Sequence, residues 1–276
     1  MLGLCRFSFP ADLNSFSQNG ESVEARRAAL YAVDRMEMRF LWFEHIAYRC
    51  ARHQTDKDFT LLVLLGEDFP EPYRARMEAM SAQSDQIQLI YRPAGDMRTT
   101  CREVMCAARE PDADVVAEFW LDDDDGIARN FVARARTDFA LGAAMYDAQK
   151  RLAIDYQKGV VVRLKDDGVR YIPHRARNWC AGQIVYLDPS SPKCTFDFPH
   201  YRVWSRMPTL TFSEQVMFLR GEHAMNDSKI SLTSGVGYKM KDENLKAMLR
   251  RRFDFDHEAF EEGWDILRAR GDALDG

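Results

Sequence analysis

Short apolar runs alternate with amphipathic segments through the first half of the chain. The run at 59–65 is continuously apolar, as a strand that is covered on both faces would be. Between the runs, apolar residues recur at spacings of three and four, which predicts helices. Strands are therefore expected at 2–9, 59–65, 87–91 and 115–121, and helices within 36–50, 73–80, 98–109 and 131–139.

This alternation predicts an α/β fold with a parallel sheet and helices on both faces, because parallel neighbours need crossover connections. Such sheets bind ligands at the carboxyl ends of their strands. From Leu152 onward the pattern changes to a hairpin at 160–172 and a strand at 181–187, and we interpret 188–208 as a functional loop. Two amphipathic helices should end the chain, at 243–252 and 257–270. We expect one domain in three parts, residues 1–140, 141–242 and 243–276.

Composition and charge mainly exclude certain classes of function. The 276 residues include 43 Asp and Glu against 38 Lys and Arg, a formal charge of −5. Without clustered lysines and arginines, the chain is not expected to bind a long nucleic acid. No apolar window approaches the length of a membrane span, and the N-terminus lacks the basic and long apolar regions of a secretory signal. The six cysteines are scattered, so we expect reduced thiols in a cytoplasmic protein.

Four consecutive aspartates, Asp122 to Asp125, directly follow the predicted strand at 115–121. Adjacent carboxylates repel one another, and Asp is disfavoured in strands, so the cluster needs an explanation. The four aspartates could cap the helix that follows, or they could bind a divalent cation such as Mg²⁺ or Mn²⁺. In extended backbone, alternate side chains share a side, which would pair Asp122 with Asp124 and Asp123 with Asp125.

The strand ending WLDDDD resembles the DxD signature of nucleotide-sugar glycosyltransferases with the GT-A fold. More narrowly, the chain resembles the bacterial family named "putative rhamnosyltransferase". The resembling stretches are RFSF (6–9), RMEMRFLWFEHI (35–46), QTDKDFTLLVLLGEDFPEPYRARMEAM (54–80) and FWLDDDDGIARNFV (119–132), with weaker similarity in HYRVWSRMP (200–208) and LRGEHAMNDSKI (219–230).

The resemblance implies a GT-A-like, mixed and mostly parallel sheet flanked by helices, with a hairpin-and-loop acceptor half and C-terminal helices. Residues 1–140 would bind a nucleotide sugar, and residues 141–242 an acceptor. The implied reaction is metal-dependent transfer of a sugar, rhamnose by the family's name, from a nucleoside diphosphate to a glycan or other hydroxyl acceptor, with inversion.

The resemblance also implies roles for individual residues of this sequence. Asp124 would be the main ligand of Mn²⁺ or Mg²⁺, and Asp122 would bind the donor ribose or share the metal with Asp125. His223, which precedes the polar residues 226–228, would complete the metal shell, with His200 as its competitor. The other residues expected to bind the donor are Arg6, Ser8, Glu67, Asp68, Arg98 and Arg102. The general base would be an acid downstream of the aspartates, and the candidates are Glu214, Glu222 and Asp197.

Two other functions are compatible with an acidic strand end. A sugar nucleotidyltransferase of similar fold usually has a glycine-rich phosphate loop after the first strand, but residues 6–20 contain a single glycine. A non-catalytic interaction protein could use the aspartates only to bind a cation. Donor hydrolysis that depends on Mn²⁺ would distinguish an enzyme from such a protein.

Overall fold

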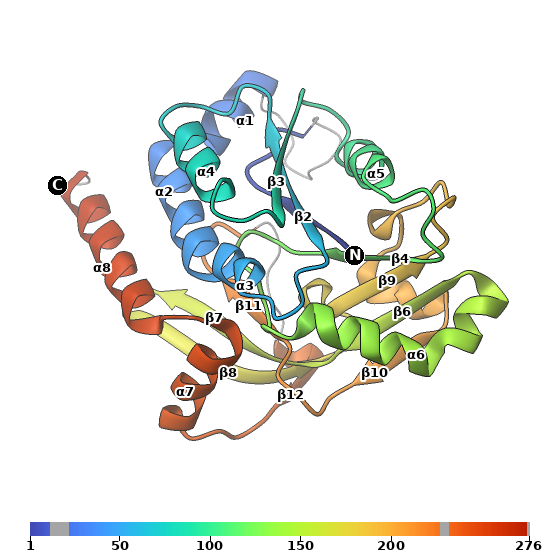
Figure 1. Ribbon diagram of the computed structural model, residues 1–276. Helices are drawn as coiled ribbons and strands as arrows, with labels where there is room; N and C mark the ends of the chain where they lie inside the picture. Colours follow the sequence, from blue (N-terminus) through green and yellow to red (C-terminus); the bar gives the residue numbers. More distant parts are fainter. Residues whose placement is uncertain (12–21, 227–231, 275–276) are drawn as a thin grey trace.

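The main sheet of the protein has seven strands in the order β10-β6-β9-β4-β1-β2-β3 (Figure 1). This computed structural model describes residues 1–11, 22–226 and 232–274. Strands β4, β1, β2 and β3 are mutually parallel, whereas β9 runs antiparallel to both β4 and β6. The sheet is therefore mixed and mostly parallel, which confirms the predicted fold class. Its strands are β1 (Leu2–Arg6), β2 (Thr60–Gly66), β3 (Ile87–Arg92), β4 (Val116–Trp120), β6 (Arg151–Tyr156), β9 (Gln183–Leu187) and β10 (Thr209–Phe212).

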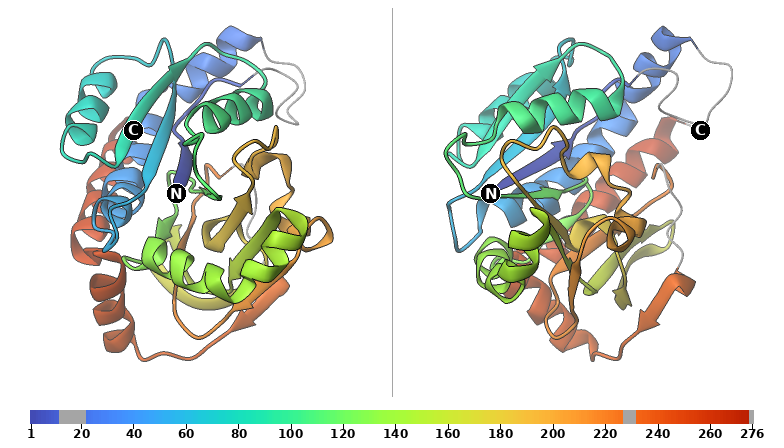
Figure 2. Two further views of the ribbon diagram at one scale, coloured as in Figure 1. Left: turned by 45° about the vertical axis from the view of Figure 1, so that its right-hand side comes forward. Right: turned by 90° about the vertical axis from the view of Figure 1, so that its right-hand side faces the viewer.

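Both faces of β2 are buried, as its continuous apolar run predicted. Alternate residues of β2 belong to different core clusters: Leu61 and Val63 pack with α2 and α4, whereas Leu62 and Leu64 pack with α5. Figure 1 accordingly shows α5 on the opposite side of β1 and β2 from α2 and α4. Helix α6 lies along β6 (Figure 2). These helices are α2 (Val33–Trp42), α4 (Tyr73–Ser81), α5 (Met97–Ala107) and α6 (Phe131–Gln149), and the short α1 (Val23–Leu30) precedes them.

The helix predicted within 36–50 is longer and contains a π-helical turn. It starts as α2, passes through a π-helical segment η2 (Phe43–Ala47) and ends as α3 (Tyr48–Arg52), with right-handed helical backbone at both junctions. The apolar positions of the pattern all face the core, from Met36 to Cys50. The periodicity therefore predicted the buried face correctly.

A second, five-stranded sheet has the order β12-β8-β7-β11-β5. The predicted hairpin is its centre, strands β7 (Lys158–Lys165) and β8 (Gly168–Ala176). The sequence analysis missed β5 (Gly126–Ile127), β11 (Phe218–Glu222) and β12 (Gly235–Gly237), and also β6 and β10 in the main sheet. These strands are two to six residues long, and β11 contains a glycine and two charged residues, so none shows a clear apolar pattern.

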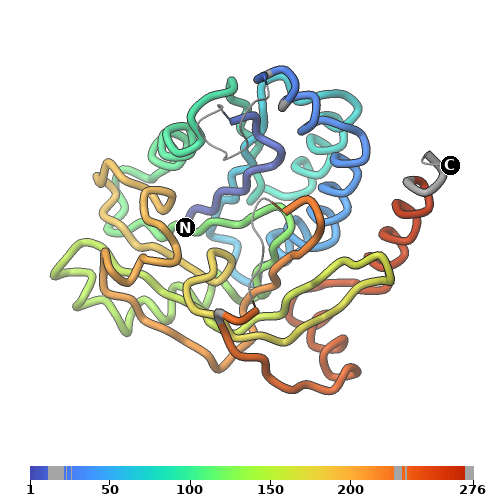
Figure 3. Tube along the Cα trace, turned by 180° about the vertical axis from the view of Figure 1, so that it is seen from behind, coloured from blue at the N-terminus to red at the C-terminus, as the bar shows by residue number. Residues whose placement is uncertain are grey.

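The two C-terminal helices were predicted, and the second packs against the first half of the chain. Helix α7 (Asp242–Phe253) leads into α8 (His257–Leu274). The ring of Phe260 on α8 lies 4.9 Å from that of Trp42 on α2. Figure 3 shows α2 and α8 side by side, seen from behind. None of the helices in the described part of the chain is long and apolar enough to cross a membrane.

Candidate active site

The aspartates lie at the carboxyl edge of the main sheet. Strands β1, β2 and β4 are parallel, so their carboxyl ends share this edge. Strand β9 runs antiparallel, so its amino end and the preceding 3₁₀ turn η3 (Cys180–Gly182) lie there too. The edge is where ligands of such sheets bind.

The aspartates form a tight turn, not an extended segment. Strand β4 ends at Trp120, and the amide of Asp125 donates to the carbonyl oxygen of Asp122 at 3.0 Å. We call residues 122–125 the aspartate turn. The predicted pairing of alternate aspartates is therefore wrong, because the turn brings Asp122 and Asp125 together instead. The helix-capping alternative is also wrong, because α6 begins at Phe131 with Asn130 as its N-cap residue.

An arginine occupies the space between the carboxylates of Asp122 and Asp125. Strand β11 pairs with β5 so that Leu219 lies opposite Gly126, which places Arg220 beside the turn. Its Nη1 lies 2.5 Å from Asp125 Oδ2, 3.2 Å from Asp122 Oδ2 and 3.5 Å from Cys180 Sγ. Among groups of three or more potential ligands in the described residues, Asp122, Asp125 and Cys180 have ligand atoms close enough together to hold a metal ion. A cation between Asp122 and Asp125 would therefore have to displace the guanidinium group.

A second arginine, Arg6, holds the other oxygen of Asp122. Its Nη2 lies 3.2 Å from Asp122 Oδ1, which also accepts a hydrogen bond from Trp120 Nε1 at 2.7 Å. The guanidinium group lies over the Trp120 ring, 4.6 Å from its centroid. Burial opposes ionisation of Asp122, but Arg6 and Arg220 outweigh it and hold the pKa of this carboxyl below its usual value.

Asp123 points the other way, into the protein, and binds Arg39 of α2. The Arg39 Nη1 and Asp123 Oδ1 atoms are 2.5 Å apart, and both side chains are buried. Within the described residues, Asp123 Oδ2 has no hydrogen-bond partner. Burial raises the pKa of Asp123 to about 7, although Arg39 opposes the shift. Asp123 therefore titrates near neutral pH, and burial also raises the pKa of Asp125 well above its usual value, although Arg220 opposes the shift.

The structure brings His223 to Asp124, as the sequence analysis predicted. His223 Nε2 lies 3.3 Å from Asp124 Oδ2, and the side-chain amide of Asn226 donates to the same oxygen at 2.6 Å. Burial opposes ionisation of Asp124, but the contact with His223 and the charges of Arg220 and Arg39 hold its pKa well below the usual value. Of the polar residues 226–228 named with His223, Asp227 and Ser228 lie outside the described residues.

The separation of Asp124 Oδ2 and His223 Nε2 suits a divalent cation, whereas the hydrogen bonding of the imidazole does not. Neighbouring ligands of an octahedral cation with bonds of about 2.1 Å are roughly 3 Å apart, close to the separation of these two atoms. In the described part of the chain, the buried His223 Nε2 has no hydrogen-bond partner with good geometry. The Met225 amide donates to Nδ1 at 3.2 Å, so the neutral ring carries its proton on Nε2, towards Asp124. Ligation by Nε2 would require the other tautomer.

The residues predicted to bind the donor have different surroundings. Glu67 and Arg98 are exposed, and Asp68 binds Arg27 at 2.9 Å. Ser8 follows β1 and is buried with a left-handed backbone, φ 46°. Arg6 contacts the aspartate turn, as described above. Arg102, in contrast, donates through Nε to both carboxylate oxygens of Asp197 at 2.9 Å, so its guanidinium group anchors the 188–208 loop.

Two of the three candidate bases are paired with arginines. Asp197 binds Arg102, which together with backbone donation outweighs burial and lowers its pKa. Glu222 binds Arg163 at 2.8 Å. Glu214 is exposed, and its carbonyl oxygen accepts a hydrogen bond from the Lys158 side chain at 3.2 Å. A carboxylate held by an arginine must leave it before it can bind the acceptor hydroxyl, which disfavours Asp197 and Glu222.

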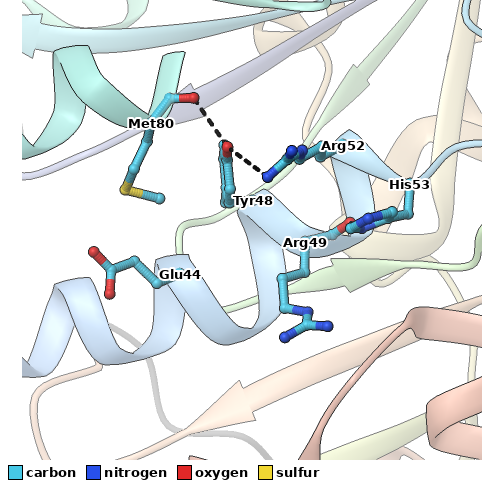
Figure 4. A pocket seen from close by; sticks show the side chains of 6 residues that line it. All are labelled: Glu44, Tyr48, Arg49, Arg52, His53 and Met80. Atoms are coloured by element: carbon cyan, nitrogen blue, oxygen red, sulfur yellow. Dashed lines mark hydrogen bonds between the residues drawn. The ribbon is translucent and has the colours of Figure 1, made fainter. Parts of the chain in front are cut away.

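A hollow of about 340 Å³ lies elsewhere, on the helix that contains η2 and α3 (Figure 4). It is lined by Glu44, Tyr48, Arg49, Arg52, His53 and Met80. No residue of the aspartate turn is among them, and its arginines bind protein acceptors, Arg49 to Asp254 and Arg52 to Gln83. The aspartate turn therefore remains the candidate site.

The glycine that follows Arg220 is required by the close approach of β11 to the turn. A Cβ atom at Gly221 would lie 2.7 Å from the Cβ of Asp124. We expect Gly221→Ala to lower the free energy of unfolding by about 1–3 kcal/mol, because the turn must shift. Urea unfolding measures this, and Gly237→Ala is the control, because a Cβ there would meet only Pro173 O, at 3.8 Å. Equal losses in the two variants would contradict this packing argument.

Together, the fold and the site define an α/β protein with an arginine-bridged acidic turn at the carboxyl edge of a mostly parallel sheet. Residues 1–234 match the family described as "Putative rhamnosyl transferase". The chain belongs to this family, whose members are glycosyltransferases, and the resemblance seen in the sequence is thereby confirmed. No match was found among curated proteins.

Several solved structures are similar to this one. Residues 1–349 of TarS from S. aureus are 10% identical, with 80% of this chain and 60% of that chain covered and a TM-score of 0.41. TarS in complex with UDP-GlcNAc is 9% identical, with 83% and 62% covered and a TM-score of 0.43. A "putative nucleotide-diphospho-sugar transferase" from Desulfovibrio desulfuricans G20 is 11% identical, with 98% and 96% covered and a TM-score of 0.42. The chain thus spans less than two thirds of the TarS chains.

Proposed function

We propose that the protein transfers a sugar from a nucleoside diphosphate donor to a hydroxyl acceptor, in a reaction that depends on a divalent cation and inverts the anomeric centre. The observation that carries the proposal is the aspartate turn at the carboxyl end of β4, in a chain whose residues 1–234 match a glycosyltransferase family. Rhamnose is the sugar that the family's description indicates. The acceptor would be a glycan or another hydroxyl compound.

Asp124 and His223 would hold the cation, and Asp122 and Asp125 could join them once Arg220 is displaced. A bound Mn²⁺ or Mg²⁺ would neutralise the diphosphate leaving group. Arg6 and Arg220 are placed to donate to phosphate oxygens, since both reach the aspartate turn. Glu67, Asp68, Ser8 and Arg98 would border the nucleoside, while Arg102 keeps the 188–208 loop in place.

We expect a nucleoside diphosphate to bind weakly without a divalent cation. The pKa values of Asp122 and Asp124 are lowered, so these two carboxylates stay ionised and would repel a phosphate group placed beside them without a cation. Calorimetry with a panel of nucleoside diphosphates, with Mn²⁺ and with chelator, measures the difference. Equal affinity in chelator would remove the metal from the proposal, and incubation of the panel's nucleotide sugars with hydroxyl acceptors tests transfer itself.

We expect His223→Ala to weaken Mn²⁺-dependent donor binding and to raise the ratio of donor hydrolysis to transfer. His223 follows β11, so its contact with Asp124 ties the second sheet to the aspartate turn and helps to close the site against water. The same calorimetry and a product assay measure both effects. His200→Ala is the control for metal dependence, which it should leave unchanged. If His223→Ala also leaves Mn²⁺ affinity and product ratio unchanged, the histidine is structural.

A further inference from the structure

A small cavity lies one side chain away from the aspartate turn. It has room for about one water molecule, 10 Å³, and is lined by Trp120, Cys180, Gln183, Thr195, Phe198 and His200. Two of these residues touch Asp122: Trp120 Nε1 donates to its Oδ1 at 2.7 Å, and Cys180 Sγ lies 3.8 Å from its Oδ2. Trp120 and His200 meet edge to face, with ring centroids 6.3 Å apart. His200 therefore borders the candidate site from the side of the 188–208 loop.

The tautomer of His200 is fixed by the protein backbone. Its Nδ1 lies 2.7 Å from the carbonyl oxygen of Asn178. A carbonyl oxygen can only accept a hydrogen bond, so Nδ1 carries the proton and the neutral ring has its lone pair on Nε2. Across the described ranges, no group forms a hydrogen bond with Nε2. The nitrogen that could accept a proton is therefore the one left without a partner.

Burial is the main reason why this imidazole stays neutral. Burial lowers the pKa of His200, and the Arg220 charge acts in the same direction, whereas the Asn178 carbonyl and the charge of Asp122 oppose them. The net effect is a pKa below the usual value for histidine. His200 is therefore in its proton-accepting form at neutral pH.

A buried carboxylate holds the group that orients His200. Asn178 has a left-handed backbone, φ 57°, and its backbone N–H donates to both carboxylate oxygens of Asp155, at 3.0 and 3.1 Å. Gln183 Nε2 donates to the carbonyl oxygen of His200 at 3.1 Å, which fixes the loop as well. The imidazole is thus oriented by a second group that is itself anchored, the arrangement that an activated base requires.

We propose that His200 is the general base that takes the proton from the acceptor hydroxyl. This role rests on the proposed sugar transfer. The hydroxyl proton passes to Nε2 while the acceptor oxygen forms a bond to the anomeric carbon. The bond from that carbon to the phosphate oxygen breaks, and the nucleoside diphosphate leaves with the electron pair. His200 later returns the proton to solvent.

The same short helix offers a binding surface for a carbohydrate acceptor. His200 begins the 3₁₀ helix η5 (His200–Ser205), in which side chains three residues apart share a face. Tyr201 and Trp204 form such a pair, and they are 58% and 63% exposed, whereas His200 and Val203 share another, more buried face. The ring of Tyr201 nevertheless lies 5.6 Å from that of His200. Exposed aromatic rings beside the base would pack against the apolar face of a sugar ring. A carbohydrate is thus the acceptor class that the segment favours.

The deciding variant is His200→Asn. Its side-chain amide can replace Nδ1–H as donor to the Asn178 carbonyl, but it offers no base at the position of Nε2. With a glycan acceptor, kcat should fall about 10²–10⁴-fold, the usual contribution of a general base, while donor affinity and acceptor KM stay near the wild-type values. Thermal melts would verify the fold. His174→Asn is the control, because His174 is a buried histidine stacked on Trp179, and it should keep wild-type kcat.

The pH profile separates a base from a structural histidine. In the wild type, kcat/KM should fall as acid protonates His200, and this acidic limb should disappear in His200→Asn. Asp123 also titrates near neutral pH, so Asp123→Asn should be measured beside it and should retain the limb. A kcat within threefold of wild type in His200→Asn, or an unchanged acidic limb, would overturn the role. Absence of transfer by the wild type with every donor would overturn the proposed function and this role together.

Discussion

Asp124→Asn is expected to abolish sugar transfer while the protein still folds. The carboxylate is buried, and its Oδ2 meets His223 and Asn226, so the variant removes the charge from the pair whose separation suits a cation. An amide binds Mn²⁺ far more weakly than a carboxylate does, and donor binding should lose its dependence on the metal. Product assays and calorimetry measure the two losses. Near-normal turnover would show that Asp124 is not the ligand.

The neighbouring variant Asp123→Asn is the matched control, because the two aspartates have opposite pKa shifts. The pKa of Asp124 is lowered in the folded protein, so its charge stabilises the fold, and Asp124→Asn should lower the melting temperature at pH 8. The pKa of Asp123 is raised to about 7, so its charge opposes folding above that pH. Asp123→Asn removes this penalty but leaves the buried Arg39 without an ionised partner, so it should change the melting temperature at pH 8 less than Asp124→Asn does, and it should keep transfer. The penalty removed should shrink as the pH falls from about 7 towards the usual pKa of Asp.

The sequence predicted the parallel part of the fold well because its signals are local. Each strand from β1 to β4 is a short apolar run, and each connecting helix has an apolar stripe, so hydrophobic pattern and connection rules suffice. The position of the aspartate turn follows directly, since it ends β4. The meeting of His223 with Asp124 was inferred from the family resemblance, and the structure brings the two together.

The arginines of the site could not be predicted from local sequence patterns. They reach the aspartates only through the packing of elements that are distant in the sequence. Arg220 and Asp125 are 95 residues apart, and they meet only because the two-residue strand β5 pairs with β11. Arg39 is 84 residues from Asp123, and its one signal is a charge between the apolar residues Met38 and Phe40. A charged residue in a buried helical stretch indicates a buried partner, but the pattern does not say which.

Arg220→Met is expected to destabilise the protein strongly, and Mn²⁺ should restore part of the loss. Removal of the guanidinium group leaves the fully buried Asp125 without a cation, beside the half-buried Asp122, which keeps only Arg6. Breaking a buried ion pair from one side typically costs roughly 3–5 kcal/mol. A divalent cation can occupy the vacated position between the two carboxylates. It would then stabilise the variant more than the wild type, in which Arg220 competes for the same oxygens.

Urea unfolding with and without Mn²⁺ measures both effects, and Arg163→Met is the matched control. Arg163 also binds a carboxylate from β11, that of Glu222, but the two side chains are 22% and 23% exposed, so water can replace the lost partner. Its loss should stay within about 1 kcal/mol, the usual value of a solvated pair, and should not respond to Mn²⁺. If Mn²⁺ stabilises Arg220→Met and the wild type equally, the cation binds apart from Asp122 and Asp125. The pair of Asp124 and His223 would then be its site, with Arg220 as a permanent counter-ion of the turn.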